Sequence, residues 1–548
     1  MEKRVILAIA LCVAVIIFWS KFFPARPPTP APSPSAATAP ATEPSREPGP
    51  PPGGTASAAP AAATVNHPEQ RVVVETPDVH FVFSSLGGTL LHAKLRGAKF
   101  LDRPNDPASG HDLVQSIDPK DAPLRTTFPN SGFAAPADGA WDVKQPAPNT
   151  VVFSTDSGSV HIEKRYTVDT TRYRLHLQVS LTNRGDQPVE QHLALSLTGR
   201  QDPDRRGGGF MSGSSANPAS MVCLFDDDKI ERRPIDKLGK DPIDKLGAIK
   251  WIGSDEKFFL LAAVPYPEPT PAERRCATSA PNYGTGEITL SFAGRTIAPH
   301  ASTEYAFAIF DGPKYIADLD AVQPAGEEVK LDKAVDVTLA ILSRPILSLL
   351  KFFHSFAHNW GLAIILLTLF IKLVTFYPTQ KSLLSAKKMQ KLAPKMNAIR
   401  KKYENDRQRQ SVETMNLYKA HGVSPFGGCL PSLIQMPIWI ALYSTLNYAV
   451  ELYRAPFFGH IHDLTAKDPF YITPLLMGGV MFAQMRMSPS GADQQQQQMM
   501  SLMMPVMFTA FSLFLPAGLA LYMLTSYLIG ILQQLYINHL DRKGATAV

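Results

Sequence analysis

Residues 361–377 read GLAIILLTLFIKLVTFY, an apolar run that contains a single charge, Lys372. A helix that crosses a bilayer needs about 20 predominantly apolar residues, so this run and its flanks predict a membrane span. A charged side chain near the centre of such a helix costs about 2.5–3.5 kcal/mol on insertion scales. Lys372 is therefore expected to bind something, to pair with a carboxylate, or to reach the membrane surface through its long stem.

The chain after Lys372 predicts four more spans. Residues 430–450 carry no charge, and residues 499–538 contain no Asp, Glu, Lys or Arg. Pro516-Ala517-Gly518 divides the second block into two helices. Together with an N-terminal anchor, the prediction is six spans. The last five are expected at about 359–378, 429–450, 471–487, 499–515 and 518–538.

The first 64 residues predict an anchor and a tether. An apolar run, Val5–Trp19, follows two basic residues, but bulky and charged residues occupy the place of a signal-peptide cleavage site. Residues 1–23 are therefore expected to remain as an uncleaved span. Residues 24–64 hold 13 prolines among Ala, Ser and Thr, a composition that cannot bury a core and predicts a disordered linker.

Residues 65–330 have the pattern of β-strands. In Arg172–Thr182, RYRLHLQVSLT, apolar and polar residues alternate, which is typical of a half-buried strand. Similar but weaker patterns lie at 161–168, 190–197 and 304–310. We expect an antiparallel β-sandwich. The hexapeptide PIDKLG occurs at 234–239 and again at 242–247, a duplication that indicates an inserted loop.

Residues 331–355 predict an amphipathic helix that lies along the membrane surface. Its apolar positions are spaced 4, 3, 4, 3 and 4 residues apart, charged residues occupy the other faces, and Pro345 is expected to kink it. A helix packed on the β-rich domain is the alternative. The apolar stripe consists of Val335, Leu339, Leu342, Ile346, Leu349 and Phe353.

Positive charge predicts the orientation of the spans. Loop 379–424 holds 11 Lys or Arg and loop 451–470 holds two, and such residues concentrate on the cytoplasmic side. Both chain ends are basic as well. We therefore expect the termini, the first loop and a short tail at 542–548 in the cytoplasm, with the β-rich domain on the outer side.

Polar side chains in the predicted spans indicate a wet site around Lys372. Thr368 lies one helical turn before it, and no span carries an acidic partner. Because polar groups in spans prefer the bundle interior, Lys372 is expected to meet an anionic visitor or a hydrated groove. Two alternatives remain. The Lys372 side chain could instead reach the membrane interface, and each of the other polar residues could instead form a helix–helix hydrogen bond. The candidate groove residues are Lys372, Thr368, Gln435, Ser432 and Tyr522.

Loop 379–424 predicts a basic helical hairpin. Apolar residues at 389, 392, 396, 399 and 403 form a helical stripe. Pro394 is expected in the first turn of a second helix, and Glu404-Asn405-Asp406 is expected to turn the chain back into Ser411–Ala420. The positive charge suits RNA, a ribosome or anionic headgroups, although a solvated loop also explains it. The candidate contact residues are Lys387, Lys388, Lys391, Arg400 and Lys401.

Catalytic and cofactor-binding motifs are missing from the sequence. There is no P-loop, GxSxG or HExxH, and the four cysteines have no zinc spacing. We therefore expect no enzyme activity, no cofactor and no metal. Cys223 and Cys276 share the β-rich segment, and they either pair or remain free thiols.

Several motifs resemble the YidC family of membrane protein insertases. The resemblance extends over the whole chain, and GGCLPSLIQMP is highly specific. It implies the Gram-negative form, in which a large periplasmic β domain of the supersandwich type precedes a five-span core, here 356–541. The motifs are PFGGCLPSLIQMPIWIAL at 425–442, Ala455-Pro456-Phe457, His462-Asp463-Leu464, Asp468-Pro469, Met504-Pro505 and Pro516-Ala517-Gly518-Leu519.

The resemblance implies an insertase and chaperone of the bacterial inner membrane, which inserts, folds and assembles membrane proteins alone or with the Sec translocon. A hydrated groove, open to cytoplasm and lipid, would present Lys372 to the short, often acidic segment that a client translocates. The client's apolar segment would slide along neighbouring spans. The implied partners are nascent membrane proteins, the translocon, the ribosome through the hairpin, and lipids, with no small-molecule substrate. The candidate slide residues are Met436, Met503 and Met507.

The sequence departs from the family pattern in three respects. The cation is Lys where many relatives have Arg, Pro378 comes one residue later than usual, and the short tail leaves ribosome contact to the hairpin. Two other functions fit the residues alone. A transporter with an external sensory domain predicts solute flux, although intramembrane carboxylates for ion coupling are missing. An assembly scaffold, whose β domain binds an envelope partner or a carbohydrate, predicts complete loss of activity when 65–320 is deleted.

Overall fold

The structure is a computed structural model, and its described residues all belong to one compact unit, 62–548. The predicted anchor at 1–23 and linker at 24–64 lie outside the described residues. The description covers residues 68–545 except 104–105, 107–108, 117, 136–138, 171, 202–218, 269–272, 336–338, 423–429 and 488–493.

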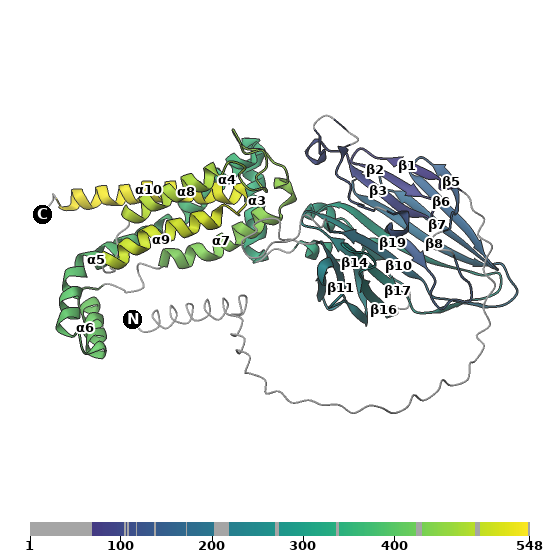
Figure 1. The fold of residues 1–548 in the computed structure, drawn as a ribbon, viewed down its shortest axis with the longest axis horizontal. Coiled ribbons are helices and arrows are strands. Elements are labelled where there is room, and N and C mark those ends of the chain that lie inside the picture. The colour runs from purple at the N-terminus through teal and green to yellow at the C-terminus, as the bar shows by residue number, and fades with distance from the viewer. Residues whose placement is uncertain are drawn as a thin grey trace, which may run out of the picture. The chain divides into compact units, whose positions relative to one another are not determined.

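Antiparallel β-sheets make up the N-terminal part of the described chain (Figure 1). A nine-stranded sheet has the order β12 (Ile230–Pro234), β11 (Ser220–Phe225), β14 (Ile249–Asp255), β15 (Phe259–Pro265), β19 (Ser302–Pro313), β8 (Arg174–Asn183), β7 (Val160–Val168), β6 (Thr150–Ser157) and β5 (Asp142–Ala147). A five-stranded sheet has the order β13 (Asp244–Gly247), β16 (Arg274–Ser279), β17 (Thr285–Ser291), β10 (Ala194–Arg200) and β4 (Arg125–Thr127). Smaller sheets join β1 (Arg71–Glu75), β2 (Val79–Ser84) and β3 (Thr89–Leu95), and β9 (Val189–Gln191) and β18 (Arg295–Ile297).

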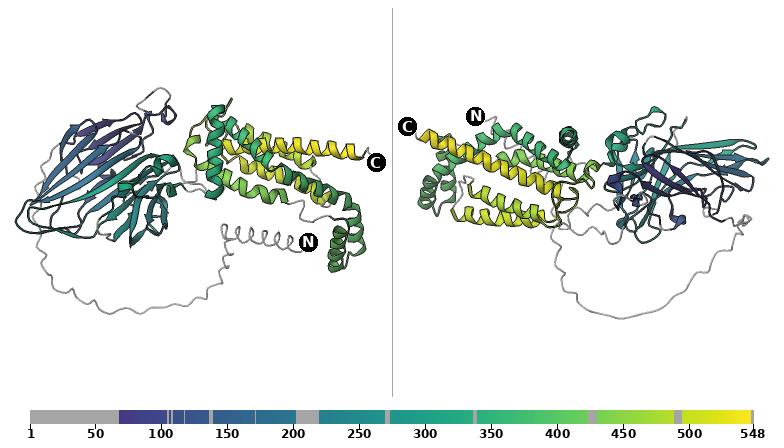
Figure 2. Two further views of the ribbon diagram at one scale, coloured as in Figure 1. Left: turned by 180° about the vertical axis from the view of Figure 1, so that it is seen from behind. Right: turned by 90° about the horizontal axis from the view of Figure 1, so that it is seen from above.

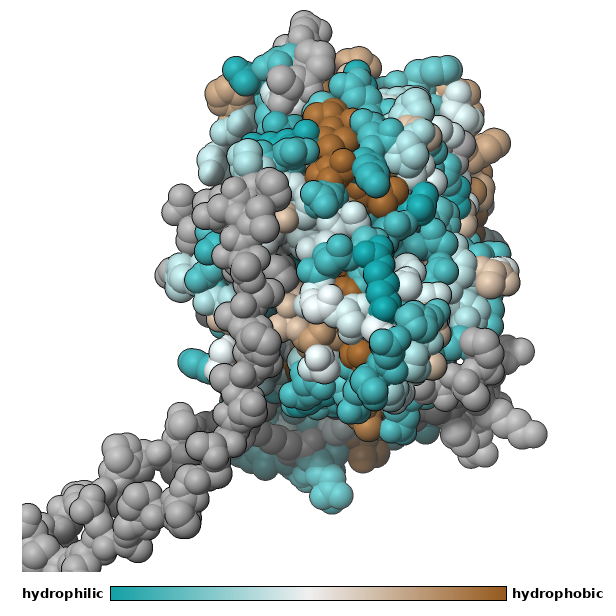
Figure 3. All heavy atoms as spheres, turned by 90° about the vertical axis from the view of Figure 1, so that its right-hand side faces the viewer, coloured by the Kyte–Doolittle hydropathy of each residue, from teal (hydrophilic) through white to brown (hydrophobic). Residues whose placement is uncertain are grey.

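The apolar residues of the alternating pattern in β8 form part of the hydrophobic core of the β domain. Leu175, Leu177, Val179 and Leu181 of β8 are all fully buried, and β8 pairs with β7 on one side and β19 on the other. The prediction of a β-rich domain is confirmed. The expected strand at 190–197 is wrong in detail, because β9 and β10 divide it between two sheets. Over most of the face shown in Figure 3 the described residues are hydrophilic, and the hydrophobic ones form small patches, as expected for a surface in contact with water.

The duplicated hexapeptide is not an inserted loop. Its first copy ends β12 and enters a short 3₁₀ turn, Ile235–Lys237, whereas its second copy forms β13 at the edge of the five-stranded sheet. β13 pairs with β16 from Asp244 to Gly247. Both copies are therefore part of the folded domain.

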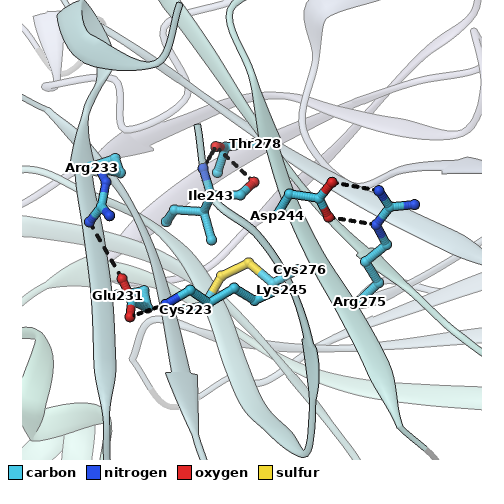
Figure 4. Close-up of a disulfide and its surroundings, with 9 residues drawn as sticks. All are labelled: Cys223, Glu231, Arg233, Ile243, Asp244, Lys245, Arg275, Cys276 and Thr278. Atoms are coloured by element: carbon cyan, nitrogen blue, oxygen red, sulfur yellow. Dashed lines mark hydrogen bonds and ion pairs between the residues drawn. A yellow bond between two sulfur atoms is a disulfide. The ribbon is translucent and has the colours of Figure 1, made fainter. Parts of the chain in front are cut away.

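A disulfide links the two large sheets. Cys223 lies on β11 and Cys276 on β16, both are fully buried, and their Cα atoms are 6.8 Å apart (Figure 4). Of the two alternatives left by the sequence, the structure has the paired form. Glu231, close by in Figure 4, is buried and accepts from Lys245 at 2.5 Å.

Lys164 is buried at an inward position of β7, where the alternation favours an apolar residue. Its Nζ donates to the carbonyl oxygens of Gly87 (3.0 Å) and Leu124 (2.8 Å). Burial lowers the pKa of this ammonium well below its ordinary value. The side chain therefore ties two loops to the strand through hydrogen bonds.

Asp311, on β19, is a buried carboxyl group in an unusual position. Within the described residues neither of its oxygens has a hydrogen-bond partner. Burial, reinforced by the negative charges of Asp112 and Glu256, raises the pKa of Asp311 well above its ordinary value. The folded protein therefore holds this proton at pH values where the unfolded chain has lost it.

A pH dependence of stability follows for Asp311. Because its pKa is higher in the folded state, its contribution to stability is complete below about pH 4, the pKa of an unperturbed Asp, and is lost as the pH rises through the folded-state pKa. Asp311→Asn cannot ionise, so it should not share the loss of stability that the natural protein suffers as the pH rises, about 1.4 kcal/mol for each unit by which the folded state raises the pKa of Asp311. Urea unfolding between pH 4 and pH 9 measures this difference. Parallel stability curves for the two proteins would contradict the interpretation.

Helices make up the C-terminal part. They are α3 (Ala340–Ala357), α4 (Trp360–Val374), α5 (Phe376–Lys402), α6 (Arg407–Ala420), α7 (Leu430–Tyr448), α8 (Ile472–Met487), α9 (Gln494–Ser512) and α10 (Ala517–Ala545). Figures 1 and 2 show α8 and α10 side by side, and α10 also packs against α4 and α7. The α5–α6 hairpin projects from one end of this bundle.

The amphipathic helix differs from the prediction at its start and in its buried face. α3 begins at Ala340 rather than at 331, because Leu331–Ala334 forms a 3₁₀ turn packed in the β core and Leu339 adopts a left-handed conformation (φ 55°). The buried residues are Ser343, Ile346 and Leu350, whereas Leu342 of the predicted stripe is exposed. Its position at a membrane surface stays a prediction.

The number of spans also stays a prediction. By length and composition, one helical segment among the described residues, Ala517–His539 of α10, is suited to cross a bilayer alone. α4 and α5 together make a second candidate, but they meet at a bend of 62°. The other helices of the bundle are shorter or more polar.

Candidate functional site

Lys372 lies in the last turn of α4, next to the bend into α5. Asn359 caps the start of α4 by accepting from the Leu362 N–H (3.0 Å), and the helix ends at Val374. The ammonium-bearing side chain is half-buried, and no carboxylate of the described residues lies within ion-pair distance of it. The role of Lys372 as the cation of a groove stays a prediction.

Thr368 lies one turn earlier on the same helix and is fully buried. Its hydroxyl donates to the carbonyl oxygen of Ile364 at 2.7 Å, so its proton is used within the helix. Next to it, Leu367 and Ile371 belong to the apolar core of the bundle. Thr368 therefore places a polar oxygen inside the bundle, between that core and the turn that carries Lys372.

Gln435 and Tyr522 come together across the bundle, although 87 positions separate them in the sequence. The Gln435 amide donates to the Tyr522 hydroxyl at 2.6 Å and so joins α7 to α10. Tyr522 is buried and Gln435 is half-buried. The fifth candidate, Ser432, is in α7, but its side chain lies outside the described residues.

Other polar groups of α7 serve helix packing. The Thr445 hydroxyl donates to Ala441 O (2.8 Å) and approaches Ser343 O on α3 (3.3 Å). Ser343 in turn donates to Ala441 O. For Thr445 the structure favours the helix–helix contact over a place in a wet cavity.

The candidate slide residues occupy two environments. Met436 on α7 is half-buried, whereas Met503 and Met507 on α9 are more than half exposed. Leu502 and Val506 share the exposed face of α9. This face offers flexible thioethers and branched side chains to lipid or to another apolar helix.

The basic hairpin is present, with one correction. α5 continues through Pro394 to Lys402, so this proline does not begin a second helix. The chain turns at Tyr403–Asp406 as expected, and α6 begins at Arg407, where the Asp406 carboxylate accepts from the Arg409 N–H. Of the candidate contact residues, Lys388, Lys391 and Lys401 are exposed, and Lys387 and Arg400 are half-buried.

The loop between α7 and α8 closes the end of the bundle opposite the hairpin, and sequence reasoning did not foresee its role. Gly518 N donates to Leu464 O (2.9 Å) and Ala517 N to Ala466 O (2.7 Å), which fixes the loop to the start of α10. Phe457 packs so closely on Gly361 that a Cβ there would lie 2.0 Å from its ring. The motifs in this loop that resemble the YidC family, such as Ala455-Pro456-Phe457, were the only indication in the sequence that the loop is structurally important.

Asp468, one of these motif residues, has a clear structural role in the loop. Its buried carboxylate accepts from the N–H groups of Phe470 (3.0 Å) and Thr473 (2.7 Å) at the start of α8. Burial opposes ionisation, but these hydrogen bonds and one from His460 outweigh it and lower the pKa of Asp468. The residue caps a helix and shapes the loop.

The chemistry available at the site is binding by charge and hydrogen bonds. No group of three or more His, Cys, Asp or Glu side chains suited to a metal ion occurs within the described ranges. Lys372 offers a cation, and Gln435 and Tyr522 offer an amide and a hydroxyl. Such groups attract and orient a polar or anionic segment.

Comparison with known proteins gives consistent matches over both parts of the chain. Residues 71–349 match the model of the YidC periplasmic domain, and residues 352–544 match the 60Kd inner membrane protein model.

Curated relatives match nearly the whole chain. A membrane protein insertase YidC of Syntrophus aciditrophicus is 34% identical over 563 residues, covering 98% of this chain and 99% of that protein. Proteins of the same name from Geotalea daltonii (33% identical, 98% and 99% covered) and from an Anaeromyxobacter species (36%, 98% and 96%) are also similar. With a periplasmic β domain followed by the inner-membrane core, the chain belongs to the YidC family.

Proposed function

We propose that this protein inserts and folds integral membrane proteins in the bacterial inner membrane, and that Lys372 is the group that first attracts the polar segment of a client. The observation that supports this most is a cation without a described acidic partner, placed where α4 breaks toward α5. A charge retained at that depth needs an anionic visitor or water. A client segment that contains Asp or Glu is such an anionic visitor.

The proposed mechanism uses no fuel molecule. A hydrated groove shortens the low-dielectric distance that a polar segment must cross, which lowers the barrier. Gln435 and Tyr522 supply hydrogen bonds deeper in the bundle, and Thr368 supplies an acceptor oxygen. The client's apolar segment then leaves along the exposed face of α9 with Met503 and Met507, and past Met436.

We place both termini and the hairpin in the cytoplasm and the β domain in the periplasm, with six spans in all. The charge difference between loops 379–424 and 451–470 supports this orientation. Exposed lysines on α5, Lys388, Lys391 and Lys401, suit contact with ribosomal RNA or with anionic lipid headgroups. Nascent membrane proteins and the Sec translocon complete the proposed partners.

Charge reversal of Lys372 in cells depleted of their own insertase tests the proposal. Loss of client insertion supports it, and full complementation contradicts it. The transporter alternative predicts solute flux across reconstituted vesicles instead. The scaffold alternative predicts that deletion of residues 65–320 abolishes activity, whereas the insertase predicts that most activity survives.

A further inference from the structure

The short turn that follows α7, η10 (Val450–Leu452), belongs to two hydrophobic cores at once. Val450 is 0% exposed and packs in the core of the β domain, and Leu452 is 1% exposed and packs in the core of the helical bundle. Two residues of one 3₁₀ turn therefore bury their side chains in separate domains.

Tyr453, the next residue, enters an aromatic pocket of the β domain. Its ring centroid lies 5.1 Å from that of Phe258, 5.3 Å from Phe259 and 5.8 Å from Phe100. The Phe259 ring meets it edge-on, and the Phe100 ring stacks on it, both favoured arrangements. The pocket residues come from two segments far apart in the sequence, so it exists only in the folded domain.

Hydrogen bonds surround the aromatic pocket. Lys99 donates to Val450 O (2.9 Å), and Arg454 donates to Leu101 O (2.8 Å) and to the Asp102 carboxylate (2.6 Å). Burial lowers the pKa of Lys99 to about 8, against the opposing effect of Glu451, as expected where water is largely excluded.

Backbone strain at Arg454 also indicates that contacts with the β domain hold this loop in place. Its φ of 49° is in the left-handed region, which a non-glycine residue adopts only when its surroundings hold it there. The contacts to Leu101 and Asp102 provide that restraint. On the bundle side, Lys351 of α3 pairs with Glu451 at 2.5 Å.

We propose that Val450–Arg454 is an interdomain anchor that holds the β domain to the end of the helical bundle opposite the hairpin, with Tyr453 as its central residue. The same loop also contacts the first turn of α4 through Phe457 and the start of α10 through Leu464. The β domain thus restrains the end of α7, the helix that carries Gln435. This inference stands whether or not the chain inserts membrane proteins.

A cysteine pair tests the anchor in the full-length protein. D102C with R454C, in a background where Cys12 and Cys429 are serine, should be joined by a short bis-maleimide cross-linker, because the ends of the two natural side chains are 2.6 Å apart. D102C with F458C is the matched control, since Phe458 lies on the same loop but is exposed. Mass spectrometry of the linked peptides reads out both. Failure of the first pair to link, or equal linking of the control pair, would overturn the proposal.

Amide hydrogen exchange tests whether the Tyr453 ring holds the loop to the β domain. Tyr453→Ala should raise amide exchange at both 98–102 and 449–455 by roughly tenfold or more, because local opening then releases both sides of the anchor. Tyr453→Phe keeps the ring and should exchange much as the natural protein does. Unchanged exchange in Tyr453→Ala would show that the pocket does not hold the loop. If that variant does not fold, the cysteine pair decides alone.

Discussion

Lys372→Glu is expected to reduce the insertion of clients with acidic external tails by roughly tenfold or more. Two unit charges 4 Å apart interact by about 4 kcal/mol at an effective dielectric constant of 20. Charge reversal turns this attraction into a repulsion, and 1.4 kcal/mol already corresponds to a factor of ten. The effect should therefore remain large even if water weakens the interaction. Protease protection of a client tail in insertase-depleted cells measures it.

Three controls make this result specific. Lys372→Arg keeps the charge and should retain most activity. Lys419→Glu makes the same charge change on the exposed surface of α6, at a residue outside the proposed contacts, and should affect tail translocation far less. A client whose tail has been neutralised should be less sensitive to Lys372→Glu than its acidic parent. Equal insertion of the acidic client by Lys372→Glu and the natural protein would remove the proposed role of the cation.

Loss of the Cys223–Cys276 disulfide is expected to lower the free energy of unfolding of the β domain by about 4 kcal/mol. The bond closes a loop of 53 residues, and the chain-entropy model assigns a penalty of that size to the freed unfolded chain. The bond also holds β11 of the nine-stranded sheet against β16 of the five-stranded sheet. Urea unfolding of Cys223→Ser/Cys276→Ser, followed by the fluorescence of the buried Trp251, measures the loss.

Matched variants separate the bond from the thiols. Cys12→Ser/Cys429→Ser changes two cysteines that are not in this pair and should leave the unfolding midpoint of the β domain unchanged. Reduction of the natural protein should lower the midpoint as far as the double serine variant does. A double variant as stable as the natural protein would show that the two sulfurs contribute no cross-link in solution.

The alternation of apolar and polar residues made the β domain predictable from the sequence. The duplicated hexapeptide PIDKLG shows where local sequence does not determine the structure. Ile235 and Ile243 are both buried, but Leu238 is 2% exposed in the first copy and Leu246 is 63% exposed in the second. The second copy is a strand because β16 is there to pair with it. Identical local sequences thus fold according to their neighbours, which local propensity does not encode.

The start of α3 shows a similar limit. Apolar spacing suggested a helix from Asp332, but Leu331 and Ala334 are buried in the β core, and this tertiary packing outweighs the local preference for a helix. Within α3 the buried face includes Ser343, whose small side chain allows close contact with Ala441 of α7. A polar residue on a buried face is invisible to a pattern of apolar residues.

The candidate site was only partly accessible from the sequence. Lys372 was conspicuous because it is a charge within an apolar run. The Gln435–Tyr522 bond and the contact of Lys99 with Val450, 351 positions apart, depend on the fold, and spacing along the chain does not reveal them. Lys164 was visible in principle, as a charged residue at an inward position of a strand.

Water access to position 372 is the central claim, and cysteine labelling tests it most directly. In a variant with Cys12 and Cys429 replaced, Lys372→Cys should react with a membrane-impermeant maleimide added from the cytoplasmic side. Leu373→Cys, next in the helix but on an exposed apolar face, should not react, and Lys388→Cys should react fully. Labelling at 372 with protection at 373 is the predicted result. A cysteine at 372 that is as unreactive as one at 373 would contradict the proposed groove.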